Sequence, residues 1–155
     1  MKAVFPGSFD PFTLGHRNLV ERTARLFSDV VVAVGVNSAK DYLFSFEERV
    51  TLARASVADL ANVVVEPMDG LLVDFCRDHA VGTIVKGART GGDFEAELAQ
   101  AQMNASYSGI ETVIVPAAAA WGFMSSTLVR QCFRGGGDVR GYVPQAVADY
   151  WNKER

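Results

Sequence analysis

Cysteine, histidine and long apolar runs are all scarce in this sequence of 155 residues. Its two cysteines, Cys76 and Cys132, lack the paired spacing of a zinc site, so we expect reduced thiols in a cytoplasmic protein. The longest aliphatic stretch, Val30–Val36, is far shorter than the roughly 20 apolar residues of a membrane helix. Pro6 and Gly7 interrupt any signal-peptide core. We therefore expect a cytoplasmic chain with no membrane partner.

Several sequence patterns typical of catalysis are also missing. The chain has no G-x-x-x-x-G-K-[ST] loop, no G-x-G-x-x-G, no G-x-S-x-G and no H-E-x-x-H. These absences weigh against kinases, dehydrogenases and hydrolases. The net charge is −3, from 15 basic and 18 acidic side chains, so no basic field for nucleic acid is expected. A local cluster of cations could still bind small anions.

Apolar residues make up 49% of the chain, which is enough for one core, and we expect a single domain over residues 1–155. Strand-like runs alternate with segments of helical spacing. The predicted strands cover residues 3–5, 30–36, 63–65, 83–85 and 112–115. This alternation predicts an α/β fold, a doubly wound five-stranded parallel sheet. The apolar residues of the predicted helices fall on inner stripes, so no exposed apolar patch is expected.

Ligands of such sheets bind beyond the carboxyl ends of the strands, at a topological switch point. The segments that follow four of the strands are therefore the candidates for a site. They are Pro6–His16, Asn37–Phe44, Lys86–Asp93 and Ala117–Ser126.

The first of these segments is suited to an anion. Gly7 permits close approach of the backbone, Ser8 offers a hydroxyl, and Gly15-His16 opens a helix whose free N–H groups favour negative charge. Taken alone, the same residues are equally explained by a turn, a helix cap and a surface histidine.

Further features of this kind follow the other strands. They are Lys40, Lys86-Gly87-Ala88-Arg89, Ser125-Ser126-Thr127 and Arg130. Each one by itself is explained by a solvated cation or an ordinary cap. Because all of them gather at one end of the sheet of an acidic protein, together they predict a phosphate-binding site.

The motifs then become recognisable. Gly7-Ser8-Phe9-Asp10-Pro11 with Thr13-Leu14-Gly15-His16 resembles the T/H-x-G-H signature of the nucleotidylyltransferase superfamily. Four further motifs extend the likeness over nearly the whole chain: Phe44-Ser45-Phe46-Glu47-Glu48-Arg49, Lys86-Gly87-Ala88-Arg89, Asp93-Phe94-Glu95-Ala96-Glu97 and Trp121-Gly122-Phe123-Met124-Ser125-Ser126-Thr127. Together they are similar to the bacterial phosphopantetheine adenylyltransferase family.

This resemblance implies a Rossmann-like nucleotidylyltransferase fold and a reaction. The family transfers the adenylyl group of ATP to 4′-phosphopantetheine, giving dephospho-coenzyme A and pyrophosphate in the penultimate step of coenzyme A synthesis. It also implies Mg²⁺ as cofactor, a homohexamer, and coenzyme A as feedback inhibitor. The sequence has no dedicated carboxylate pair for the metal, so most Mg²⁺ ligands are expected to be phosphates and waters.

The resemblance also implies roles for individual residues. The expected catalytic residues are His16, Lys40 and Arg89. The expected substrate-binding residues are Ser8, Lys40, Leu72 and Lys86. The expected ATP-binding residues are Ser8, Phe9, His16, Gly87, Ala88, Arg89, Glu97, Trp121, Gly122, Phe123, Met124, Ser125, Ser126 and Thr127.

This chain departs from the family pattern at a few positions. Ser8 stands where many members have threonine, and it keeps the hydroxyl. Lys86 stands where some have arginine, so it keeps the charge but loses a bidentate fork. The stretch 117–120, four alanines, replaces a more polar one, which leaves the shape of that loop open.

Two other functions compete with this one. The first is a nucleotidylyltransferase with another acceptor, such as nicotinamide mononucleotide or glycerol phosphate; the stretch 121–127 disfavours CTP as donor. The second is a sensor that binds ATP without turnover. A sensor has no need of Lys40 and Lys86 directed at a second anion, and pyrophosphate release separates the two classes.

Overall fold

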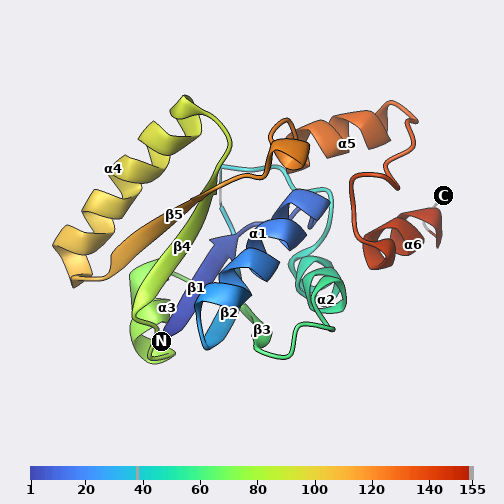
Figure 1. Cartoon of the computed structure of the whole chain (residues 1–155). Coiled ribbons are helices and arrows are strands. Elements are labelled where there is room, and N and C mark those ends of the chain that lie inside the picture. Colours follow the sequence, from blue (N-terminus) through green and yellow to red (C-terminus); the bar gives the residue numbers. More distant parts are fainter. Residues whose placement is uncertain (38, 154–155) are drawn as a thin grey trace.

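Helices cover both faces of one parallel five-stranded sheet (Figure 1). The computed structural model describes residues 1–37 and 39–153. The strand order is β3-β2-β1-β4-β5. The elements in chain order are β1 (Lys2–Gly7), α1 (Leu14–Leu26), β2 (Asp29–Val34), α2 (Phe46–Ser56), β3 (Val63–Pro67), α3 (Leu72–Asp78), β4 (Thr83–Ala88), α4 (Gly91–Ser108), β5 (Glu111–Pro116), the 3₁₀ turn η1 (Ala119–Trp121), α5 (Ser126–Arg134) and α6 (Gln145–Lys153).

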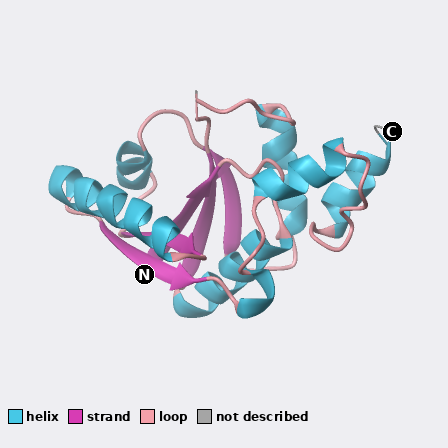
Figure 2. Cartoon of the chain, turned by 90° about the horizontal axis from the view of Figure 1, so that it is seen from above, coloured by secondary structure: helices cyan, strands magenta, loops and turns pink. Residues whose placement is uncertain are grey.

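Alternating side chains of the central strands supply two cores. Phe5 and Val32 face the core beneath α1 and α2, while Val4 and Val31 face a smaller one with Phe75 of α3. Seen from above, helices flank the sheet on both sides (Figure 2). Because β2 is buried on both faces, valine and alanine fill it after Asp29, and polar residues do not alternate with apolar ones.

The predicted doubly wound sheet is confirmed, and its strand ends differ from the predicted ones by at most three residues. A capping box opens α2: Ser45 Oγ accepts from the Glu48 amide, and the Glu48 carboxylate accepts from the Ser45 amide. Ser125 caps α5, with its side chain accepting from the Leu128 amide. The short η1 turn had no sequence signal.

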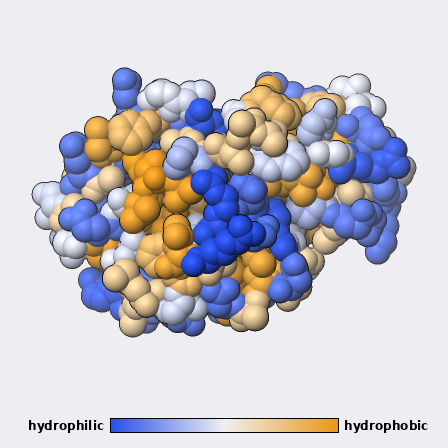
Figure 3. Space-filling view, viewed as in Figure 1, coloured by the Kyte–Doolittle hydropathy of each residue, from blue (hydrophilic) through white to orange (hydrophobic). Residues whose placement is uncertain are grey.

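The expectation that apolar side chains lie only on inner stripes is wrong for α4. Phe94 and Leu98 are 45% and 41% exposed, and Met103 and Tyr107 are more exposed still. The reason is the position of α4, which lies over β4 and β5 at one edge of the sheet. Asn104 is the buried residue of this helix. Hydrophobic side chains also gather on the surface over β5 (Figure 3), where Val113 is exposed.

No helix among the described residues is long and apolar enough to cross a membrane.

Close packing between β4 and α1 yields a stability prediction. A Cβ added at Gly87 would lie 2.3 Å from Cδ1 of the buried Leu19. We therefore expect Gly87→Ala to lower the free energy of unfolding by about 1–3 kcal/mol through overpacking, as measured by urea denaturation. Gly82→Ala is the matched control, because no atom lies within 4 Å of its added Cβ. Equal loss in the two variants would contradict this packing.

Candidate active site

A cavity of about 350 Å³ lies beyond the carboxyl ends of β1 and β4. These neighbouring strands are the switch point of the sheet, because the chain continues from β1 toward β2 and from β4 toward β5, in opposite directions. Residues from all four predicted segments line the cavity; of segment 37–44, Ser38 lies outside the described residues. The four predicted segments therefore come together at one end of the sheet.

The turn after β1 is held by an aromatic anchor. Phe9 has a φ of 51° and its side chain is buried against Phe5, Phe12 and His16. A non-glycine residue adopts this conformation at some cost, and it persists where packing determines it. The buried Phe9 ring fixes the turn and leaves Ser8 as a lining residue of the cavity.

His16 sits at the start of α1 in a capping box that sequence reasoning missed. The Thr13 amide donates to His16 Nδ1 at 3.1 Å, while Thr13 Oγ1 accepts from the His16 amide at 3.2 Å. Because Nδ1 accepts, the neutral ring carries its proton on Nε2. His16 therefore has one ring donor, Nε2–H, that the capping box does not use.

The same surroundings keep His16 uncharged. Burial lowers the pKa of His16 to about 4, and the positive charges of Arg89 and Lys40 act in the same direction. At neutral pH the ring is thus a neutral hydrogen-bond donor rather than a cation. The resemblance implied a catalytic role for His16, but it did not predict the tautomer or the charge of the ring.

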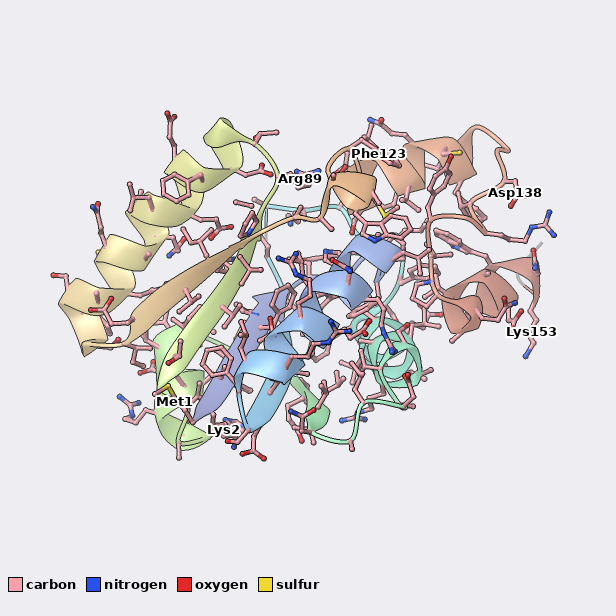
Figure 4. All side chains as sticks on the ribbon, viewed as in Figure 1. Met1, Lys2, Arg89, Phe123, Asp138 and Lys153 are labelled. Carbon is pink, nitrogen blue, oxygen red and sulfur yellow. The ribbon has the colours of Figure 1, made fainter. Side chains whose placement is uncertain are left out.

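The cations at the cavity are held by neighbouring acids and carbonyls. Lys86 Nζ lies 3.3 Å from Glu97 Oε2. Arg89 Nε donates to Asp93 Oδ2 at 3.0 Å and Nη1 donates to the Met124 carbonyl at 2.9 Å. Figure 4 shows Arg89 in the space between the start of α4 and the segment before α5. These contacts fix the directions of the Lys86 and Arg89 side chains in the absence of a ligand.

The start of α5 closes another side of the cavity. Ser126 Oγ donates to the Pro11 carbonyl at 2.8 Å, and Arg130 Nη1 donates to the Asp10 carbonyl at 2.5 Å. Both bonds tie α5 to the turn after β1, across more than 100 residues of sequence. Ser125, Ser126 and Thr127 at the start of α5 line the same cavity as His16.

Most predicted site residues meet in this cavity. They are Ser8, Phe9, His16, Lys40, Lys86, Gly87, Arg89, Glu97, Trp121, Met124, Ser125, Ser126 and Thr127. Four others lie outside its lining. Leu72 packs against the smaller core, Ala88 is buried, Gly122 follows η1, and Phe123 is exposed with its ring edge-on to Tyr142.

Arg49 and Asp10, whose roles were not predicted from the sequence, stabilise the turn after β1. Arg49 is 1% exposed, and its Nη1 donates to the carbonyls of Ser8 at 2.6 Å and Gly35 at 2.8 Å. The Asp10 carboxylate accepts from the amides of Leu43 and Phe44. Arg49 is the last residue of the motif at residues 44–49. An arginine one turn inside a helix is normally expected to be exposed to solvent, so the sequence did not predict its burial.

Comparison with known proteins agrees with this geometry. Residues 4–132 match the model of the cytidylyltransferase-like family. A phosphopantetheine adenylyltransferase of Cutibacterium acnes is 50% identical over 147 residues, which cover 95% of this chain and 94% of that protein. One from a Nocardioides species is 51% identical over 146 residues, covering 94% and 92%.

A solved structure shares the fold at much lower identity. It is described as a nicotinate-nucleotide adenylyltransferase from Vibrio parahaemolyticus, and it superposes with a TM-score of 0.74 at 20% identity, over 99% of this chain and 92% of that one. The two full-length relatives at about 50% identity decide the assignment: this chain belongs to the phosphopantetheine adenylyltransferases, within the cytidylyltransferase-like family.

Proposed function

We infer that this protein transfers the adenylyl group of ATP to 4′-phosphopantetheine, giving dephospho-coenzyme A and pyrophosphate. One observation carries the inference. A chain of this family brings together at one cavity a neutral histidine donor and three cations, Lys40 from the segment after β2 and Lys86 and Arg89 from the end of β4. That set suits a reaction between two phosphorylated substrates.

The chemistry is a single displacement at phosphorus. An oxygen of the acceptor phosphate attacks the α-phosphorus of ATP, and the bond from that phosphorus to the bridging oxygen of the β-phosphate breaks. Pyrophosphate leaves with the electron pair. The nucleophile is already an anion, so no side chain has to remove a proton from it. Such transfers depend on positioning and on neutralising charge.

The cavity residues have roles that follow from their chemistry. His16 Nε2–H donates to an oxygen of the α-phosphate, where negative charge develops. Lys40 and Lys86 neutralise the acceptor phosphate, and Arg89 the phosphates of ATP. The segment 121–127 and the start of α5 hold the nucleotide.

We propose that Mg²⁺ enters as part of the MgATP substrate. The described residues contain no group of three or more histidine, cysteine or acidic side chains placed to hold a metal. Two carboxylates at the cavity are already engaged, Asp10 by the amides of Leu43 and Phe44 and Glu97 by Lys86. Phosphate oxygens and water are the natural ligands of Mg²⁺ in such a site.

Pyrophosphate release tests the proposed reaction. With MgATP, we expect release that requires 4′-phosphopantetheine. Nicotinamide mononucleotide, glycerol 3-phosphate and the replacement of ATP by CTP should each give little. Release with one of those acceptors instead would assign a different nucleotidylyltransferase, and tight ATP binding without release for any acceptor would assign a sensor.

Catalysis should depend on the Nε2 donor of His16. We expect His16→Ala to lower kcat by about 10²–10³ without loss of fold, the effect of removing one donor to a developing charge. His16→Gln, which can place an amide N–H near the lost donor, should retain more activity than alanine. His79→Gln is the control, since His79 lies outside the cavity lining. Near-normal turnover of His16→Ala would contradict the role.

His16 should titrate far below the range usual for histidine. Imidazole ¹⁵N shifts followed by NMR, with His16→Gln for assignment, should show the Nε2–H tautomer down to about pH 5 and a midpoint near the folded pKa of about 4, against 6.5 for an ordinary histidine. Between these values the unfolded chain binds the proton and the folded protein does not. Stability should therefore fall as pH falls from 6.5 toward 4, less so in His16→Gln. A midpoint near 6.5 would contradict this environment.

We also propose a homohexamer, in which the surface around β5 and α4 lies between subunits. Its exposed apolar residues Phe94, Leu98 and Val113 support a protein contact there. Light scattering on the eluted protein should give the mass of six chains, and Leu98→Glu should give a smaller species. Leu26→Glu, at an exposed leucine on α1, should leave the mass unchanged. A monomeric mass for the unaltered protein would contradict the proposal.

Coenzyme A is the proposed feedback inhibitor. It contains both a pantetheine arm and an adenosine moiety, so it resembles the two substrates joined. We expect it to occupy the same cavity and to compete with both.

A further inference from the structure

Tyr42 lies in the cavity, where sequence reasoning assigned it no role. Its hydroxyl is 3.3 Å from Ser8 Oγ, and the same hydroxyl accepts the Asn37 amide. Tyr42 thus connects the segment that carries Lys40 to the turn that carries Ser8.

The direction of these hydrogen bonds determines what Ser8 can do. The Tyr42 oxygen accepts from Asn37, so its one proton is available for Ser8 Oγ. When Ser8 Oγ accepts that proton, its own O–H is left to donate elsewhere. The remaining partner in the cavity is a substrate phosphate, which is an acceptor. With the proton placed in this way, the Ser8 hydroxyl is a donor toward the ligand.

Arg49 holds both Tyr42 and the Ser8 turn in position. Its guanidinium carbon lies 4.0 Å from the centre of the Tyr42 ring, and its Nη1 donates to the carbonyl of Ser8. A buried guanidinium stacked on an aromatic face is a rigid and favourable contact. One buried side chain thus fixes both partners of the Tyr42–Ser8 hydrogen bond.

We propose that Tyr42 is a positioning residue that directs the Ser8 hydroxyl at the substrate phosphate and holds the Lys40 segment against the Ser8 turn. The inference rests on the proposed function. Tyr42 acts through Ser8 and not by contact with the reacting atoms, so the losses caused by changing Tyr42 and Ser8 should not be independent.

The test is a double-mutant cycle with Tyr42→Phe and Ser8→Ala. Tyr42→Phe removes one oxygen and keeps the ring on Arg49, so the protein should fold and its thermal midpoint should be close to that of the unaltered protein. We expect kcat/KM to fall about fivefold, the ratio corresponding to one neutral hydrogen bond. In the Ser8→Ala background the same change should cost less than twofold. The control is Tyr107→Phe, which removes the hydroxyl of an exposed tyrosine on α4.

A second measurement does not need turnover. Lysyl endopeptidase cleaves after Lys40, and mass spectrometry identifies the fragment that begins at Asp41. Without substrate, Tyr42→Phe should be cut there faster than the unaltered protein, and Tyr107→Phe at the unaltered rate.

The outcomes separate the two claims. If Tyr42→Phe lowered kcat/KM by the same factor in the presence of Ser8 and in the Ser8→Ala background, the role of Tyr42 would be overturned. An unchanged rate of cleavage after Lys40 would overturn it as well. Absence of pyrophosphate release from the unaltered protein would overturn the proposed function, and the cleavage assay would then decide the role of Tyr42 alone.

Discussion

Repulsion between the phosphate groups of two anionic substrates is the constraint that this cavity has to meet. The acceptor phosphate, the α-phosphate and the leaving pyrophosphate all carry negative charge. The strands β1 and β4 end side by side, and three cations line the cavity there. Lys86 lies in β4, Arg89 follows β4, and Lys40 lies in the connection after β2. The net charge of the whole protein is −3, so this gathering of cations is a local feature of the cavity.

Neighbouring groups hold the side chains of two of these cations, Lys86 and Arg89, at the cavity. Glu97, Asp93 and the Met124 carbonyl hold Lys86 and Arg89 in place. The same positive surroundings, added to burial, lower the pKa of His16 and keep it neutral. A donor without charge can approach the α-phosphate beside cations without adding to their mutual repulsion. The cations and the neutral histidine are therefore parts of one electrostatic design.

The sequence predicted much of this structure because the relevant signals are local. Alternating strand and helix patterns located the five strands, and the polar segments predicted after them line one cavity. What it could not supply depends on contacts between distant segments. The burial of Arg49 beneath Ser8 and the capping box that sets the His16 tautomer required the folded chain. Likewise, the helical pattern of Phe94 and Leu98 gave no sign that α4 lies at the edge of the sheet with these side chains exposed.

The central claim is that positioned charges and hydrogen-bond donors catalyse a single displacement, and that no side chain becomes bonded to phosphorus. The stereochemical course at the α-phosphorus tests it most directly. One diastereomer of ATP with sulfur at the α-position would be turned over with 4′-phosphopantetheine, and the configuration of the thio-substituted product determined. We predict inversion, which a single in-line attack requires. Retention would indicate two successive displacements through an adenylylated residue and would contradict it.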